Sequence, residues 1–299
     1  MNNIIKAVGL NKVYGDHHAL TNVNFCIEKG SPVALVGPNG AGKTTLFSIL
    51  CGYIKPTSGD ISILGYPPGD KALFGKLAAL PQDAQLDPRF SIAHQLKFYG
   101  QLQGFSAKKS IREVERTLEL VGLADVLHVK PSELSHGMRK RVTIAQTLIG
   151  QPQIVLLDEA SAGLDPLHAR EVREVVANLS SDITFILSSH DLNELERLCS
   201  QVLYLDQGSL KEHQTLTTSE NGHSRYFTLR MKQHEAGIIE ALQQLDSVSD
   251  VVVSQDREYL ISANTHHLET DLDILKLCHK NNWQYAQIFN GKTLENQLF

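Results

Sequence analysis

The sequence predicts an α/β fold with a mostly parallel sheet, a helical subdomain inserted into it, and a small α+β domain that follows. Three observations support this prediction. Short apolar runs alternate with helical spacing over the first two-thirds of the 299 residues. The spacing becomes mainly helical between about residues 83 and 135. A polar stretch, residues 206–224, then precedes a second series of alternating runs.

The predicted core consists of three apolar strands and two helices. "SPVALVG" is a buried strand that leads into a glycine-rich turn, and "KTTLFSILCG" is the helix that follows it. "QIVLLDEA" and "ITFILSSH" are short, β-rich runs of the kind that parallel sheets bury. The stretch between them, "DPLHAREVREVVANLS", has helical spacing, and Asp165 with Pro166 marks its start.

Helical spacing also runs through "SIAHQLKFYGQLQG" and "AKKSIREVERTLELVGL", which form the inserted subdomain at about residues 83–135. After the polar stretch, strand and helix patterns follow in the order β-α-β-β-α-β, from "RYFTLRM" to "QYAQIF". That order indicates a ferredoxin-like unit. We therefore predict two domains, residues 1–216 and residues 222–299.

The composition disfavours several classes of protein. A net charge of -5 with 20% charged residues is not typical of a nucleic-acid-binding protein. The four cysteines are far apart, which argues against a disulfide framework, and His266, His267 and His279 lack the spacing of metal ligands. The chain shows neither a secretory signal nor the run of about 18 apolar residues that a membrane span needs. We expect a soluble protein that reaches a membrane only through a partner.

A phosphate-binding turn is predicted at "GPNGAGKTT". Glycines let the backbone wrap so that consecutive N–H groups point at the phosphates, and the following helix presents its positive end to them. Lys43 is expected to reach the β- and γ-phosphates, and the Thr44 hydroxyl to ligate Mg²⁺. The residues expected to bind the nucleotide here are Gly37, Pro38, Asn39, Gly40, Ala41, Gly42, Lys43, Thr44 and Thr45.

A second acidic element is predicted at "IVLLDEA", where Asp158 follows four apolar residues and is expected to hold the Mg²⁺ shell. Two positions are open for Glu159. Side chains alternate along a strand, so Glu159 points into solvent if the strand continues. If the strand ends at Asp158, Glu159 reaches over the phosphate and activates water as a general base.

The stretch "LSHGMRKRVTIAQTLIG" begins with a glycine-containing turn and continues as a helix. Ser135 is expected to cap that helix. The cations Arg139, Lys140 and Arg141 either flank a bound anion or are simply solvated, and we favour the second alternative for Lys140.

Together these motifs resemble the ATP-binding cassette (ABC) family, the ATPase subunits of ABC transporters, over residues 3–215. The glycine-rich turn resembles Walker A and "IVLLDEA" resembles Walker B with its catalytic glutamate. "SAGLDP" is similar to the D-loop, which ends at Asp165. The resemblance implies a P-loop NTPase core with Gln82 as the Q-loop residue that meets the metal, His190 as the sensor of the γ-phosphate, and Tyr14 stacked on adenine.

"LSHGM" occupies the place of the family's LSGGQ signature. Ser135 and Gly137 are retained, while His136 and Met138 depart from the consensus. The resemblance implies that this loop closes over the γ-phosphate held by a second ATPase subunit, taken to be a copy of the same chain. A loop serine, a glycine N–H and a helix N-terminus are suitable donors for that anion.

The resemblance also implies partners and a location. We expect a multi-span membrane permease as partner, ATP and Mg²⁺ as cofactors, no nucleic acid, and a cytoplasmic position at the inner face of the membrane. The C-terminal pattern resembles the extra domain of single-cassette exporter ATPases. The alternatives are a soluble cassette ATPase that acts on nucleic acid or the ribosome, and a nucleotide-gated regulator.

Overall fold

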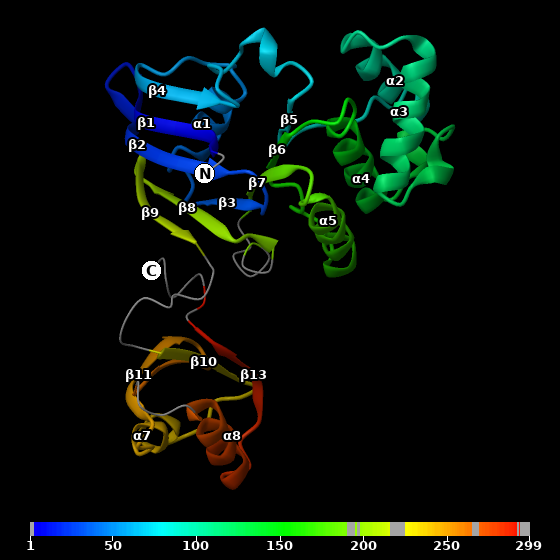
Figure 1. Ribbon diagram of the computed structural model, residues 1–299. Helices are drawn as coiled ribbons and strands as arrows, with labels where there is room; N and C mark the ends of the chain where they lie inside the picture. The colour runs from blue at the N-terminus through cyan, green and yellow to red at the C-terminus, as the bar shows by residue number, and fades with distance from the viewer. Residues whose placement is uncertain are drawn as a thin grey trace. The chain divides into compact units, whose positions relative to one another are not determined.

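The computed structural model describes residues 3–189, 195, 198–215, 225–264, 269–291 and 293. The chain forms two compact units, Met1–Leu216 and Thr217–Phe299 (Figure 1). In the described residues, no helix is long and apolar enough to cross a membrane.

A six-stranded sheet forms the centre of the first unit, in the order β5-β6-β7-β3-β8-β9. All neighbours pair in parallel except the last two, which are antiparallel. Every residue of β3 and β7 is buried, because a sheet covered on both faces leaves no polar side for these apolar runs. The strands are β3 (Val33–Val36), β5 (Leu77–Leu80), β6 (Ile154–Asp158), β7 (Thr184–Ser188), β8 (Gln201–Asp206) and β9 (Ser209–Thr215).

A three-stranded antiparallel sheet, in the order β2-β1-β4, packs over the same core. Its strands are β1 (Asn3–Tyr14), β2 (His17–Glu28) and β4 (Ser58–Ile63). Apolar residues such as Ile5 and Leu20 face the helix α1 (Lys43–Leu50) and the central sheet within one hydrophobic cluster. The predicted elements did not include this sheet.

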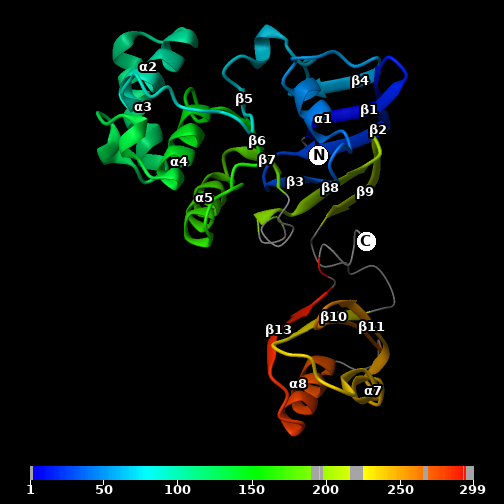
Figure 2. The same cartoon turned by 180° about the vertical axis from the view of Figure 1, so that it is seen from behind.

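The helices α2 (Ile92–Leu102), α3 (Ala107–Leu120) and α4 (His136–Thr147) lie together at the β5 end of the central sheet (Figures 1 and 2). Both α2 and α3 fall in the range predicted to be helical. Serine hydroxyls cap all three helices at their N-termini, from Ser91, Ser106 and Ser135. The helix α5 (Pro166–Leu179) follows β6 and begins after Asp165, as predicted. Short 3₁₀ turns occupy Lys71–Leu73, Ala124–Val126 and Pro131–Glu133.

The second unit is a four-stranded antiparallel sheet, in the order β11-β12-β10-β13, with two helices on one face (Figures 1 and 2). Its elements follow one another as β-α-β-β-α-β. They are β10 (Arg225–Met231), α7 (Ile238–Gln243), β11 (Val248–Gln255), β12 (Glu258–Ala263), α8 (Thr270–Lys280) and β13 (Tyr285–Asn290). Phe227, Tyr259 and Ile274 belong to its own hydrophobic core, so this unit buries its apolar face without the first one.

Candidate functional site

The turn between β3 and α1 has a backbone that requires glycine at two positions. Gly37 has a φ of +152°, and a Cβ there would lie 2.0 Å from the carbonyl oxygen of Leu205. Gly42 has a φ of +106°, and a Cβ there would lie 2.5 Å from the carbonyl oxygen of Ala19. The turn therefore fits tightly onto β8 and β2, and its outer residues Pro38, Asn39 and Gly40 are exposed. This is a cradle of backbone groups open to a ligand.

Lys43 lies inside this turn at the first position of α1. Its Nζ donates hydrogen bonds of 2.6 Å to the carbonyl oxygen of Gly37 and 3.0 Å to that of Pro38. Burial lowers the pKa of Lys43, and the nearby carboxylates of Glu159 and Asp158 act in the opposite direction. The ammonium group therefore lies between the turn and the acidic end of β6. Thr44 is exposed beside it, Thr45 is half-buried, and Ala41 is buried in the core.

The strand β6 ends at Asp158, and the chain turns sharply at Glu159. Glu159 has a φ of +50°, and its backbone N–H donates to the carbonyl oxygen and to the hydroxyl of Ser188, at 3.1 Å in both cases. The Ser188 hydroxyl in turn donates to Oδ1 of Asp158. Of the two positions open for Glu159, the structure has the one in which the strand stops before it.

Ser188 was not among the predicted site residues. It lies at the end of β7 in register with Asp158, because the two parallel strands finish at the same edge of the sheet. The apolar run "ITFILSSH" changes to polar residues at Ser188, and this change was the sequence signal that could have identified Ser188 as a site residue.

Gln82 reaches the same edge of the sheet from the segment after β5. Its Nε2 donates a hydrogen bond of 2.8 Å to Oε2 of Glu159, which is 77 residues away in the sequence. The segment that carries Gln82 leads on to α2, so this hydrogen bond connects the acidic end of β6 with the start of the helical part.

The cations of α4 are not free in solvent, and the interpretation of Lys140 as solvated is wrong. Arg139 Nη1 donates to the carbonyl oxygens of Leu134 at 2.7 Å and Pro131 at 3.3 Å. Arg141 forms an ion pair of 3.2 Å with Glu171 and is only 13% exposed. Lys140 is half-buried, so burial lowers its pKa, while Asp158 and Glu159 raise it. All three side chains are half-buried, because α4 packs against α3, β5, α2 and α5.

The first turn of α4 is held as predicted by Ser135, whose hydroxyl accepts from the backbone N–H of Met138 at 3.2 Å. Ser135 and His136 are exposed, whereas Gly137 is buried. Asp165 caps α5 in the same way, since its Oδ1 accepts from the N–H groups of Leu167 at 3.0 Å and His168 at 3.1 Å.

Two of the predicted residues take no part in the contacts described above: Tyr14 has other neighbours, and the structure does not describe His190. Tyr14 ends β1 with 47% of its surface exposed, and the Lys12 ammonium lies 4.8 Å from the centre of its ring. The ring is therefore about half exposed, with the Lys12 ammonium over one of its faces. His190 lies outside the described residues.

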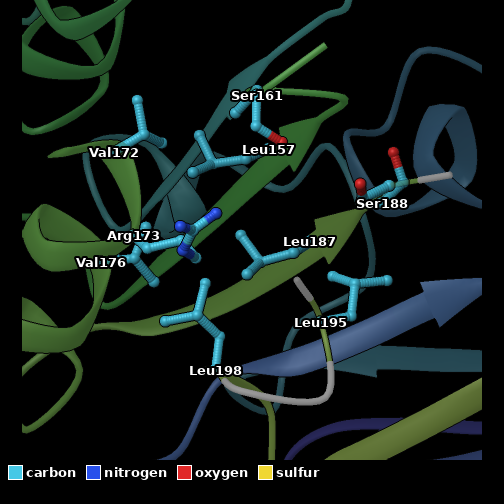
Figure 3. A pocket seen from close by; sticks show the side chains of 11 residues that line it. Leu157, Ser161, Val172, Arg173, Val176, Leu187, Ser188, Leu195 and Leu198 are labelled. Carbon is cyan, nitrogen blue, oxygen red and sulfur yellow. The ribbon is translucent and has the colours of Figure 1, made fainter. Parts of the chain in front are cut away.

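A small pocket is lined by residues of β6, β7 and α5 and of the segments that follow β6 and β7 (Figure 3). Its wall is mainly apolar, with Leu157, Val176 and Leu187 labelled in Figure 3, and Arg173 is its only cation among the described residues. This composition does not match a triphosphate, which the cradle around Lys43 accommodates far better.

The residues at the cradle fit a magnesium nucleotide. Thr44, Asp158 and Gln82 supply hydroxyl, carboxylate and amide oxygens, which are the donors that Mg²⁺ prefers. Within the described ranges, no group of three or more His, Cys, Asp or Glu side chains forms a metal site of its own. Mg²⁺ is commonly bound by one or two carboxylates together with the phosphates of a substrate, and this set has that form.

Cys51 directly follows α1, and the reactivity of its thiol tests how strongly burial and Asp158 affect ionisation near the end of β6. Burial, with a smaller effect from Asp158, raises the pKa of its thiol to about 12. At pH 8 we expect iodoacetamide to alkylate Cys51 roughly a thousandfold more slowly than in the unfolded chain, because only the thiolate reacts. Mass spectrometry of the Cys51 peptide, with and without denaturant, measures this ratio. Equal rates in the two conditions would contradict the assignment.

Comparisons with known proteins agree with the geometry. The family model for the ABC transporter matches residues 20–162. The ABC transporter ATP-binding protein YxlF of Bacillus subtilis is 34% identical over 230 residues, which are 77% of each chain. The linearmycin resistance ATP-binding protein LnrL of the same organism is 29% identical over 282 residues, which are 93% of this chain and 87% of LnrL.

A solved structure gives the same result. The dimeric post-hydrolysis state of the ATP-binding cassette MJ0796, bound to ADP and Pi, superimposes with a TM-score of 0.63 and 25% identity, and the match covers 71% of this chain and 98% of that one. With the cradle, the acidic strand end and these relatives in agreement, the chain belongs to the ABC transporter family and is one of its ATP-binding, ATP-hydrolysing subunits.

Proposed function

We propose that the chain drives an ABC exporter by binding and hydrolysing Mg²⁺-ATP between two copies of itself. The observation that carries this proposal is the convergence of Lys43, Gln82, Asp158 and Glu159 at one edge of the central sheet. Export is supported by LnrL, whose name assigns it to linearmycin resistance and which aligns with 93% of this chain.

Within one chain, different residues contact the phosphates, the Mg²⁺ ion and the adenine. The turn from Gly37 to Thr45 surrounds the phosphate chain, and Lys43 exchanges its carbonyl partners for phosphate oxygens. Thr44, Asp158 and Gln82 hold Mg²⁺, which neutralises charge on the β- and γ-phosphates when it is bound. Tyr14 stacks on the adenine with its exposed ring.

Glu159 acts as the general base in this proposal. Its backbone is anchored to Ser188, and its carboxylate is fixed by Gln82, so the side chain has a defined direction beside the cradle. It accepts a proton from the water that attacks the γ-phosphate. His190 is proposed to contact the same phosphate from the segment after β7.

The second copy completes each site. We place the Ser135 hydroxyl and the N-terminus of α4 from one chain over the γ-phosphate held by the other, with Asp165 in the adjacent D-loop. Closure of the two copies on ATP, and reopening after hydrolysis, then drives a separate membrane permease. The permease holds the chain at the inner face of the membrane.

The rival functions have less support. A net charge of -5 is unfavourable for contact with a nucleic-acid backbone. A regulator without turnover would have no use for a carboxylate oriented as Glu159 is.

The experiment that tests the proposal has two steps: the chain is purified from membranes to identify a multi-span protein bound to it, and the two are then reconstituted together in lipid. We expect ATP hydrolysis that depends on Mg²⁺ and rises when the permease is present in lipid. A chain that remains monomeric with saturating ATP, and that consumes none with the permease supplied, would refute the proposal.

Gln82→Ala tests the hydrogen bond to Glu159. We expect kcat to fall at least about tenfold, the effect of one lost hydrogen bond to a charged group, and the KM for Mg²⁺-ATP to rise as well, because Gln82 is also proposed to hold Mg²⁺. Steady-state ATPase kinetics measure both constants, and Gln101→Ala on the exposed side of α2 is the matched control. An unchanged kcat would show that the amide does not orient the carboxylate.

A further inference from the structure

His168, in the first turn of α5, packs directly against the signature loop "LSHGM". A Cβ placed on Gly137 would lie 2.3 Å from Cδ2 of His168 and 2.5 Å from its Cγ. The ring therefore covers the backbone of Gly137, which explains why that residue is buried while Ser135 is exposed.

The backbone conformation does not explain the glycine. Gly137 is absent from the positive-φ glycines and lies within α4, where alanine would be the better helix former. The close approach of the His168 ring is the contact in this chain that excludes a side chain at Gly137.

The same imidazole is bonded to the D-loop. His168 Nδ1 lies 2.5 Å from Oδ2 of Asp165, while Oδ1 of that carboxylate caps the helix. The bonds from His168 and Leu167 hold the pKa of Asp165 below its usual range. A carboxylate can only accept, so Nδ1 carries the proton that the bond requires. His168 is 29% exposed, and it contacts Gly137 of the signature loop and Asp165 of the D-loop.

One helical turn further on, a second contact ties the same two helices. Arg141 of α4 pairs with Glu171 of α5 at 3.2 Å, and Arg141 also donates to the carbonyl oxygen of Val121 at 3.1 Å. Two successive contacts therefore join the N-terminal halves of α4 and α5. The contact of His168 with Gly137 lies nearer to the loops than the ion pair of Arg141 with Glu171.

We infer that His168 is a positioning residue that holds the signature loop and the D-loop together as one preformed surface for the nucleotide of a second copy. This inference rests on the proposed function, because the surface has a use only if two copies close on ATP. His168 touches neither nucleotide nor reacting atoms in this assignment; it acts through Gly137 and Asp165.

The test measures ATP-dependent dimerisation in a Glu159→Gln background by analytical ultracentrifugation. We expect His168→Ala to weaken the dimer about tenfold, the effect of one charge-assisted hydrogen bond and its packing. The affinity of the monomer for a fluorescent ATP analogue should not change, because the cradle lies elsewhere. His168→Asn keeps a donor at the δ position and should restore most of the dimer. Arg170→Ala, on the exposed face of α5, is the control.

The outcomes separate the two ideas. If Glu159→Gln alone does not dimerise with ATP, the proposed function fails. If it dimerises and His168→Ala is equally tight, or if Asn is no better than Ala, the inference is overturned.

A second measurement needs no dimer. Gly137→Ala should lower the Tm of the monomer when His168 is present and should lower it less in a His168→Ala chain, because that change removes the ring atoms 2.3 and 2.5 Å away and leaves only the Cβ of residue 168, 2.8 Å away. An equal loss of Tm in both backgrounds would show that the ring does not impose the glycine, and would overturn the inference independently.

Discussion

Replacement of Glu159 by Gln is expected to slow ATP hydrolysis by about 10²–10⁴-fold, because the amide cannot accept the proton of the attacking water. The change is nearly isosteric, so the backbone contacts with Ser188 and the hydrogen bond to Gln82 have no reason to break. ATP should still bind, and the closed dimer should accumulate because hydrolysis no longer opens it. Single-turnover hydrolysis and size-exclusion chromatography with ATP measure the two effects.

Glu174→Gln provides the matched control for this experiment. Glu174 is exposed on α5 and pairs only at the surface with Arg170, at 2.8 Å, so its loss should change hydrolysis by less than about twofold. Hydrolysis at the normal rate in Glu159→Gln would remove this residue from the mechanism. A slow variant that nevertheless fails to form a dimer would instead contradict the proposed closure.

Lys43→Ala is expected to weaken ATP binding about 100-fold or more, since it removes the cation that contacts the β- and γ-phosphates. It also removes the two hydrogen bonds that Nζ makes to the turn, so the Tm without nucleotide should fall slightly. Fluorescence titration with a nucleotide analogue measures the affinity, and thermal unfolding measures the second effect.

Lys108→Ala is the control, because Lys108 is an exposed lysine on α3 in the helical part of the same unit. It should bind ATP like the parent chain. Unchanged affinity in Lys43→Ala would show that the turn is not the phosphate site.

The local patterns predicted the elements that carry the cradle. The strands β3, β6 and β7 correspond to continuous apolar runs, and the helices α1 and α5 correspond to runs with helical spacing and a clear start. The cap residues Ser135 and Asp165 were equally readable, because capping depends on side chains within three residues of the helix start. The fold class and the family followed from these short-range signals.

Contacts between segments far apart in the chain could not be predicted from the sequence. The antiparallel sheet of β1, β2 and β4 depends on strand pairing across loops, which alternation alone does not specify. Lys140 was misjudged because its burial comes from packing onto neighbouring elements, whereas the sequence shows only three adjacent cations. The direction of Glu159 likewise depends on the hydrogen bonds from its backbone to Ser188. The requirement for glycine at position 137 depends on the ring of His168, which is 31 positions away in the sequence.

The pair of bonds from Lys43 to its own turn has a consequence for ligand choice. An entering molecule has to replace two short hydrogen bonds, of 2.6 and 3.0 Å, before it can lie in the cradle. A phosphate group offers negative oxygens in exchange, whereas a bare nucleoside offers nothing of comparable strength. Discrimination at this protein therefore starts with ionic charge and only afterwards concerns the base, so adenosine should compete poorly even where inorganic triphosphate competes well.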